Sequence, residues 1–235
     1  AAEAAQALRR GAVHRGSGAF RAMYSSVAGG IVTDPALMVV PLDDHLVHRG
    51  HAVFDTAALC RGHLYELEQH LDRFLRSARL ARIPQAFPRE AVREAVVATA
   101  AASGLRDGSV RYWMSAGQGG FGLSPRECVG PSLYAVAVDT AHGKAPPDAS
   151  RGWRLATSAV PIKPPFFATV KSTNYLPNAL CVMDAEASGA DQGVFIDADG
   201  FVGEGPNMNL AIVAGGRLVV PPFESTLAGL TVQRV

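Results

Sequence analysis

The sequence predicts an α+β protein of two domains, and three observations support this fold class. The chain has 235 residues, 48% of them hydrophobic, which is enough for one large or two small domains with a buried core. Its first half alternates strand-like runs with two helical segments. The Pro/Gly/Ala-rich stretch 141–152 lacks bulky apolar residues and precedes a mostly β second half. We therefore expect a small domain at 20–141, a linker at 142–152 and a second domain at 153–235.

Residues 1–19 precede the first domain and have a different composition. They are rich in Ala, Arg and Gly, Glu3 is their only acid, and they show no apolar periodicity. Two interpretations remain open. The segment is either the remnant of an organelle transit peptide, which is typically Arg-rich and acid-poor, or a disordered leader.

The first domain is expected to begin with strands at 36–42 and 53–60, followed by a turn at Arg61-Gly62. Apolar residues then recur at helical spacing up to Pro84, namely Leu67, Leu71, Phe74, Leu75 and Ala78. Pro88 opens a second helix that Gly104 ends. Strands are expected to follow at 108–117 and 132–140.

The second domain is expected to contain fewer helices. Asn174 is predicted to cap a helix that runs to about Ser188, with Pro177 in its first turn. Strand-like segments are predicted at 154–160, 168–171 and 193–200, and a hairpin is predicted around Gly215-Gly216.

Composition excludes several classes of function. Lys and Arg number 22 and Asp and Glu 21, so the net charge of +1 provides no basic field for nucleic acid. The longest clean apolar runs, such as 133–138, fall far short of the roughly 18–20 residues that a membrane-spanning helix needs. The 3 cysteines are far apart and form no CxxC motif, which argues against a disulfide framework or structural zinc and fits a reducing compartment.

Lysine is rare, so a mechanism that needs a lysine amine has few candidates. Only Lys144, Lys163 and Lys171 are present. Lys144 lies in the linker and Lys163 lies between prolines, so both are expected to be exposed. Lys171 lies at a strand-to-helix corner behind aromatic and β-branched residues, where partial desolvation makes an amine a usable nucleophile for a carbonyl or aldehyde. The alternative is an ordinary surface lysine.

Two charged residues are further candidates. Glu204 lies between a short apolar strand and Gly205-Pro206, where a carboxylate can point into a cleft; a solvated turn acid is the alternative. Arg73 is flanked by Leu71 and Phe74, so its guanidinium can turn inward toward an anion such as phosphate. The neighbouring arginines of the same helix are expected to form a solvated basic face, namely Arg76, Arg79 and Arg82.

Two weaker motifs have simpler explanations. Gly229 gives the backbone freedom, and Thr231 can begin a helix whose N–H groups bind phosphate, but a plain capping turn explains the same residues. The run His45-x-x-His48-x-x-His51 suggests zinc. Neither a strand nor a helix brings all three rings to one face, so histidines in a polar loop are the better explanation and no metal site is predicted.

Five segments occur in order along the chain. They are DDHLVHRGHAVFDTA (43–57), HLYELEQHLDRFLRSARLARIP (63–84), VKSTNYLPNALCVMDAEASGA (170–190), DADGFVGEGPNMNLAIV (197–213) and LAGLTVQRV (227–235). This succession resembles the class IV aminotransferases, the pyridoxal-phosphate fold that includes D-amino-acid and branched-chain transaminases and aminodeoxychorismate lyase. The phrases RDGSVRYWMSAG, IKPPFFATVKSTNYLPN and EGPNMN most resemble plant plastid D-amino-acid transaminases. The resemblance begins near Phe20, reaches the last residue, and implies the two-domain class IV aminotransferase-like fold.

The resemblance implies a role for each candidate residue. Lys171 falls on the K-x-x-N-Y/L-L motif, whose lysine forms a Schiff base with pyridoxal 5′-phosphate. Glu204 falls on the V-x-E motif, whose carboxylate pairs with the pyridine nitrogen. Arg73 falls on the H-x-x-R motif of the phosphate-binding arginine. Leu230 and Thr231 fall on the G-I-T-like motif, whose backbone and hydroxyl hold the phosphate.

The implied function is transamination between a D-amino acid such as D-alanine and 2-oxoglutarate. The alternatives are aminodeoxychorismate lyase, which eliminates pyruvate to give 4-aminobenzoate, a branched-chain transaminase, and an inactive truncated fragment. The resemblance also implies a homodimer in the plastid stroma, with the cytoplasm as the alternative location. Small-molecule amino acids and 2-oxo acids are the expected partners, without nucleic acid or membrane.

Some positions depart from the family pattern. Bacterial D-amino-acid transaminases have a tyrosine where this chain has Phe54, and an Arg-x-His carboxylate trap where it has Phe121 and Leu123. The substrate carboxylate is therefore expected to be bound in another way. Family members continue past the G-L-T motif, so the larger, cofactor-binding second domain is expected to lack its C-terminal part beyond Val235.

Overall fold

The computed structural model describes residues 2–11, 18–140 and 150–235. The chain divides into two compact units, unit 1 (Ala1–Pro146) and unit 2 (Pro147–Val235). The division falls within the stretch that the sequence marks as a linker. Among the described residues, no helix is long and apolar enough to cross a membrane.

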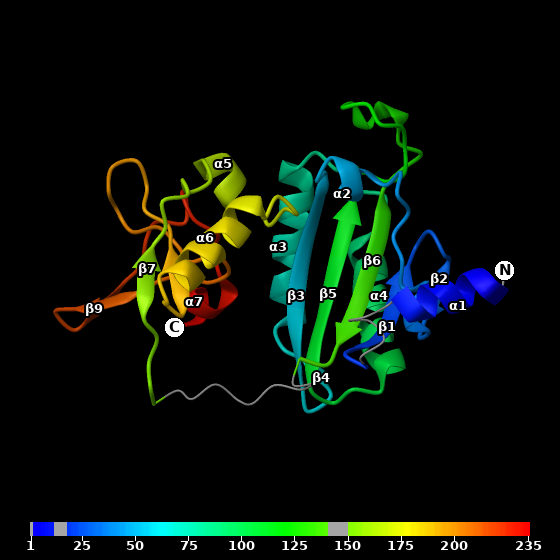
Figure 1. Ribbon diagram of the computed structural model, residues 1–235, viewed down its shortest axis with the longest axis horizontal. Coiled ribbons are helices and arrows are strands. Elements are labelled where there is room, and N and C mark those ends of the chain that lie inside the picture. Colours follow the sequence, from blue (N-terminus) through cyan, green and yellow to red (C-terminus); the bar gives the residue numbers. More distant parts are fainter. Residues whose placement is uncertain (1, 12–17, 141–149) are drawn as a thin grey trace. The chain divides into compact units, whose positions relative to one another are not determined.

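Unit 1 is built on a six-stranded antiparallel sheet with the strand order β2-β1-β6-β5-β3-β4 (Figure 1). Its strands are β1 (Phe20–Ser25), β2 (Gly30–Val32), β3 (Ala52–Cys60), β4 (His63–Leu64), β5 (Gly108–Ser115) and β6 (Ser132–Val138). The strands predicted at 53–60, 108–117 and 132–140 are confirmed as β3, β5 and β6. These three form the centre of the sheet together with β1, because periodic apolar runs are buried most deeply there.

Helices α3 (Leu67–Leu80) and α4 (Arg89–Ser103) lie behind the sheet in Figure 1 and pack on it and on each other. Both helices were predicted and are confirmed. Gly104 ends α4 in the left-handed conformation with a φ of 67°, which a residue without a side chain adopts at little cost. The ring of Phe74 on α3 contacts the ring of Tyr112 on β5, with centroids 4.9 Å apart.

The strand predicted at 36–42 is wrong. A short 3₁₀ helix, η2 (Pro35–Leu37), begins there, and the Asp34 side chain caps it by accepting the N–H of Ala36 at 3.0 Å. The prolines at positions 35 and 41 have no N–H to donate to a sheet ladder, which disfavours a strand. The sequence did not predict strands β1 and β2; β1 pairs with β6, and β2 forms the edge of the sheet beside β1.

Three short helical segments complete unit 1. They are α1 (Ala2–Gly11), α2 (His45–His48) and η3 (Pro125–Glu127). The sequence predicts no helix within 1–19. Arg9 on α1 forms an ion pair with Asp34, with 2.7 Å between Nη2 and Oδ2.

Unit 2 contains a parallel strand pair, β7 (Leu155–Thr157) and β8 (Gln192–Val194). Helices α5 (Pro165–Ala168) and α6 (Leu176–Ala187) lie between them in the chain (Figure 1). The predicted hairpin is confirmed as β9 (Ile212–Ala214) and β10 (Arg217–Val219), joined at Gly215-Gly216. The last helix is α7 (Leu230–Arg234).

Helix α6 approaches β8 closely at one glycine. A Cβ at Gly193 would lie 2.4 Å from the carbonyl oxygen and 2.5 Å from the sulfur of Cys181 on α6. Only a residue without a side chain permits this approach. The helix is thereby held directly against the strand pair.

Two local predictions in unit 2 are wrong, and both concern the neighbourhood of Lys171. The strand end predicted at 168–171 is absent: α5 ends at Ala168 and an irregular segment follows, because Pro164 and Pro165 have a fixed φ that suits the start of a helix. The residue that caps α6 is Tyr175, whereas the Asn174 side chain donates to the Ser172 hydroxyl at 3.2 Å. Pro177 lies in the first turn of α6, as predicted.

Candidate functional site

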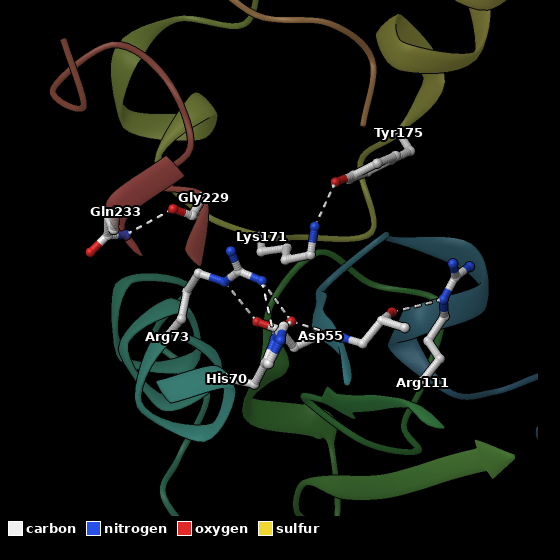
Figure 2. Close-up of polar contacts among 9 residues, drawn as sticks. Asp55, His70, Arg73, Arg111, Lys171, Tyr175, Gly229 and Gln233 are labelled. Atoms are coloured by element: carbon white, nitrogen blue, oxygen red, sulfur yellow. Dashed lines mark hydrogen bonds and ion pairs between the residues drawn. The ribbon is translucent and has the colours of Figure 1, made fainter. Parts of the chain in front are cut away.

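Lys171 lies in the irregular segment between α5 and α6 and is partly buried. Its Nζ donates to the hydroxyl of Tyr175 at 3.3 Å, and Figure 2 shows the two side chains pointing toward each other. Val170 and Ser172 on either side of it are buried. The backbone around the amine is therefore anchored on both sides, which limits the positions that the amine can reach.

Glu204 is buried, with 6% of its surface exposed, so the alternative of a solvated turn acid is wrong. Its Oε2 accepts the backbone N–H of Leu227 at 3.0 Å. Burial raises the pKa of Glu204, and the Leu227 N–H and the positive charges of Lys163 and Lys171 oppose that shift. The carboxylate and the Lys171 amine therefore interact electrostatically within unit 2.

Lys163 was expected to be exposed, and this prediction is wrong. The residue is partly buried, and its Nζ lies 4.9 Å from the centre of the Tyr175 ring. Burial lowers the pKa of Lys163, while the negative charge of Glu204 opposes the shift. The flanking prolines suggested a solvated loop, but the aromatic ring covers the ammonium group. Lys144 lies outside the described residues.

The Gly229-Leu230-Thr231 segment starts helix α7. Gly229 is the cap residue, and its carbonyl accepts the backbone N–H of Gln233 at 3.2 Å and the Gln233 side chain at 3.3 Å (Figure 2). Thr231 is exposed and Leu230 is partly buried. A Cβ at Gly229 would lie only 1.9 Å from the side-chain oxygen of Asn209. A side chain at Gly229 would therefore require the Asn209 side chain to move.

Arg73 belongs to unit 1, and its guanidinium turns inward as predicted, with 10% of the side chain exposed. Its Nε and Nη2 donate to the two carboxylate oxygens of Asp55 on β3 at 2.8 and 2.7 Å. His70, one turn earlier on α3, has its Nδ1 2.8 Å from the same carboxylate (Figure 2). Burial alone would raise the pKa of Asp55, but the hydrogen bonds from His70 and Arg73 and the positive charges hold it below its usual value.

The three histidines of the HxxHxxH run do not converge. Nε2 of His45 lies 3.3 Å from the Gly120 carbonyl, that of His48 lies 3.4 Å from the Asp43 carbonyl, and that of His51 lies 2.8 Å from the Ala81 carbonyl. Among the residues that the structure describes, no group of three or more metal-ligating side chains is found.

The positions that depart from the family pattern lie in unit 1. Phe54 is on β3, and the guanidinium of Arg111 lies 5.6 Å from the centre of its ring. Phe121 and Leu123 are exposed. The backbone carbonyls of Phe121 and Gly122 accept hydrogen bonds from Arg49, which holds this loop against α2.

Lys171, Glu204 and the 229–231 segment thus lie together in unit 2, and Arg73 lies in unit 1. The unit 2 residues match the chemistry of pyridoxal phosphate: a primary amine suits an aldehyde, a buried carboxylate suits a pyridinium nitrogen, and main-chain N–H groups suit a phosphate. At Gly229 the place that a Cβ would take is already occupied by the side-chain oxygen of Asn209, so the absence of a side chain there serves protein packing.

The raised pKa of Glu204 predicts a pH dependence of stability in the cofactor-free protein. Its folded pKa lies above the ordinary value of 4.5, so the folded state binds the proton more tightly than the unfolded state. The stability that this group contributes is therefore complete below pH 4.5 and is lost as the pH rises through the folded pKa. Urea unfolding of the wild type and Glu204→Gln between about pH 4 and pH 8 measures this contribution. The wild type should lose stability relative to the variant as the pH rises, and a constant difference would contradict the assignment.

The family model of amino-transferase class IV matches residues 52–235. The chloroplastic D-amino-acid transaminase of Arabidopsis thaliana is 56% identical over 222 residues, which are 94% of this chain and 58% of that protein. A putative branched-chain-amino-acid aminotransferase of Methanocaldococcus jannaschii is 32% identical, covering 82% of this chain and 66% of that protein. The chain therefore spans less than two thirds of the length of these two relatives.

Two further similarities concern function and fold. The bifunctional aminodeoxychorismate lyase / D-amino acid transaminase of Mycobacterium tuberculosis is 29% identical over 87% of this chain and 74% of that protein. The solved structure of a T.th. branched-chain amino acid aminotransferase with pyridoxamine 5′-phosphate matches with a TM-score of 0.82 and 24% identity. That match covers 92% of this chain and 72% of that one.

Proposed function

Because the chain belongs to the class IV aminotransferases, we propose that it transfers the amino group of a D-amino acid such as D-alanine to 2-oxoglutarate with pyridoxal phosphate. The products of this reaction are pyruvate and glutamate. The observation that carries the proposal is the presence, within unit 2, of the partly buried Lys171 amine and of the buried Glu204 carboxylate, which lie near enough for their charges to interact. The identity of 56% to a D-amino-acid transaminase supports the choice of substrate class.

Each candidate residue has a physical role in this reaction. Pyridoxal phosphate, when bound, supplies the electron sink that stabilises negative charge at the substrate's α-carbon. Lys171 would hold the cofactor at its aldehyde carbon through Nζ, and the same amine would take the proton from the substrate's α-carbon. Glu204 keeps the pyridine nitrogen protonated, because a buried carboxylate favours a neighbouring cation.

The phosphate group requires a separate set of contacts. We assign it to the backbone and hydroxyl of Leu230 and Thr231 in unit 2 and to Arg73 in unit 1. A guanidinium and main-chain N–H groups both complement a dianion. The Asp55 carboxylate holds the Arg73 side chain in one orientation, so little conformational freedom is lost when the anion binds.

The test is an assay of D-alanine and L-alanine, each with 2-oxoglutarate and pyridoxal phosphate. We expect pyruvate to form from D-alanine only when 2-oxoglutarate is present, and much more slowly from L-alanine. Thermal unfolding is measured in parallel, since a ligand that binds only the folded state raises the midpoint. A protein that melts cooperatively, gains stability from the cofactor and consumes neither substrate would contradict the proposed reaction.

Aminodeoxychorismate lyase is the second candidate, because the relative from Mycobacterium tuberculosis is named for both activities. The two reactions differ in their need for an acceptor. Elimination of pyruvate from aminodeoxychorismate requires no 2-oxo acid, whereas transamination does. Formation of 4-aminobenzoate without 2-oxoglutarate would favour the lyase.

We also propose that the protein acts in the plastid as a homodimer. The chloroplastic relative supports the location, and the family resemblance supports the dimer. Fractionation of the source cells and sedimentation of the purified protein test the two proposals. Recovery outside plastids or a monomer at micromolar concentration would contradict them.

A further inference from the structure

Both backbone groups of Leu227 are held by side chains from one tight turn. The N–H donates to Oε2 of Glu204 at 3.0 Å, and the carbonyl accepts Nδ2 of Asn209 at 2.8 Å. Glu204 and Asn209 face each other as an antiparallel bridge, and the N–H of Gly205 donates to the Met208 carbonyl at 2.8 Å. The turn at 204–209 therefore binds both the N–H and the carbonyl of Leu227.

The same asparagine also touches the chain two residues further on. Its Oδ1 occupies the place of a side chain at Gly229, since a Cβ there would lie 1.9 Å from this atom. The Asn209 amide thus contacts the segment 227–229 at both ends, with its nitrogen on Leu227 and its oxygen against Gly229. Leu230 and Thr231 follow directly.

We propose that Asn209 is a positioning residue that fixes the 227–231 segment relative to the Glu204 carboxylate. This inference rests on the proposed function, in which Glu204 meets the pyridine nitrogen and Leu230 and Thr231 meet the phosphate. The distance between these two parts of the cofactor is set by its covalent structure. Glu204 and Asn209 both hydrogen-bond to the backbone of Leu227, and we call these two contacts the clamp. The clamp fixes the distance between the Glu204 carboxylate and residues 230–231 before the cofactor binds, so that this distance matches the one between the pyridine nitrogen and the phosphate.

The clamp predicts a selective loss of affinity for the phosphorylated cofactor. Asn209→Ala and the nearly isosteric Asn209→Asp, which lacks the donor to Leu227, should each weaken binding of pyridoxal phosphate by about tenfold. Binding of pyridoxal, which has no phosphate, should change by less than about twofold. Fluorescence titration measures both ligands. Asn207→Ala, an exposed residue of the same turn, is the matched control and should bind both like the wild type.

Two readouts keep the inference independent of activity. Amide hydrogen exchange of the cofactor-free variants should quicken at residues 227–229 and stay unchanged at 170–175. In a double-mutant cycle on unfolding stability, Gly229→Ala should destabilise the wild type but not Asn209→Ala, because the clashing oxygen is gone. Additive effects in this cycle, or equal losses of affinity for the two ligands, would overturn the proposal.

Failure of the proposed function would look different. A wild type that binds neither pyridoxal phosphate nor pyridoxal would contradict the transaminase assignment. Hydrogen exchange and the double-mutant cycle would then still measure the clamp, since neither needs the cofactor. Unchanged exchange at 227–229 in both Asn209 variants would overturn the clamp even if the enzyme is active.

Discussion

Replacement of Lys171 by alanine is expected to abolish transamination and the absorbance band above roughly 400 nm that a lysine-bound cofactor gives. The change removes the amine that holds the cofactor and the group that takes the α-proton, so the rate should fall by roughly 10⁴-fold or more. The cofactor spectrum and pyruvate formation measure the two effects. Unit 2 should stay folded, because the Lys171 side chain is only partly buried.

Lys163→Ala is the matched control for this prediction. Lys163 is the other described lysine of unit 2 and contacts the same tyrosine, with its Nζ 4.9 Å from the Tyr175 ring centre. The variant should keep the absorbance band. A band that survives Lys171→Ala and disappears in Lys163→Ala would reassign the reactive amine.

Replacement of Asp55 by alanine is expected to destabilise unit 1 by about 3–5 kcal/mol. Asp55 is fully buried and accepts two hydrogen bonds from Arg73 and one from His70. Without the carboxylate, the inward-turned guanidinium loses the anion that balances its charge. Because the pKa of Asp55 is held below 3.8, its stabilising contribution is present above that pH and is lost as the pH falls through the folded value.

Urea unfolding of Asp55→Ala and Asp72→Ala measures this effect. Asp72 lies on α3 and pairs with Arg89 at 3.2 Å, but its side chain is 69% exposed, so its loss should cost at most about 1 kcal/mol. Equal costs for the two variants would show that the buried pair contributes no more than a surface ion pair.

The elements that the sequence predicts well are those with long periodic runs. Helices α3 and α4 and strands β3, β5 and β6 each place one continuous apolar face against the core, so local pattern and tertiary structure agree. The local sequence pattern did not indicate strands β1 and β2. The pairing of β1 with β6 brings together residues more than a hundred positions apart, as at Tyr24 and Ala135, and no local pattern encodes that contact.

The candidate site was predicted in part. Lys171, Glu204 and Arg73 could be found because their motifs lie in short, recognisable segments. Asp55 was missed, although the sequence contained a signal. It alternates with Val53 and Ala57 on the inward face of β3, and a carboxylate at an inward position requires a buried partner.

Asn209 and Lys163 had no comparable signal. The Asn209 amide acts on Leu227, eighteen residues later in the chain, and this contact exists only after the turn and the segment have packed together. Lys163 is partly buried, and its ammonium group faces the ring of Tyr175, the cap residue of α6, twelve residues later in the chain. A contact between a side chain and the backbone of a residue far along the chain depends on tertiary structure. The spacing of residues in the sequence therefore does not predict it.

The most direct test of the account is to find the lysine that binds the cofactor. Borohydride reduction of the protein loaded with pyridoxal phosphate makes the link permanent, and peptide mass spectrometry then locates the phosphopyridoxyl group. The chain offers only Lys144, Lys163 and Lys171, so the result is unambiguous. We expect the label on Lys171 alone; a label on either of the other two, or no label on a folded protein, would contradict the account.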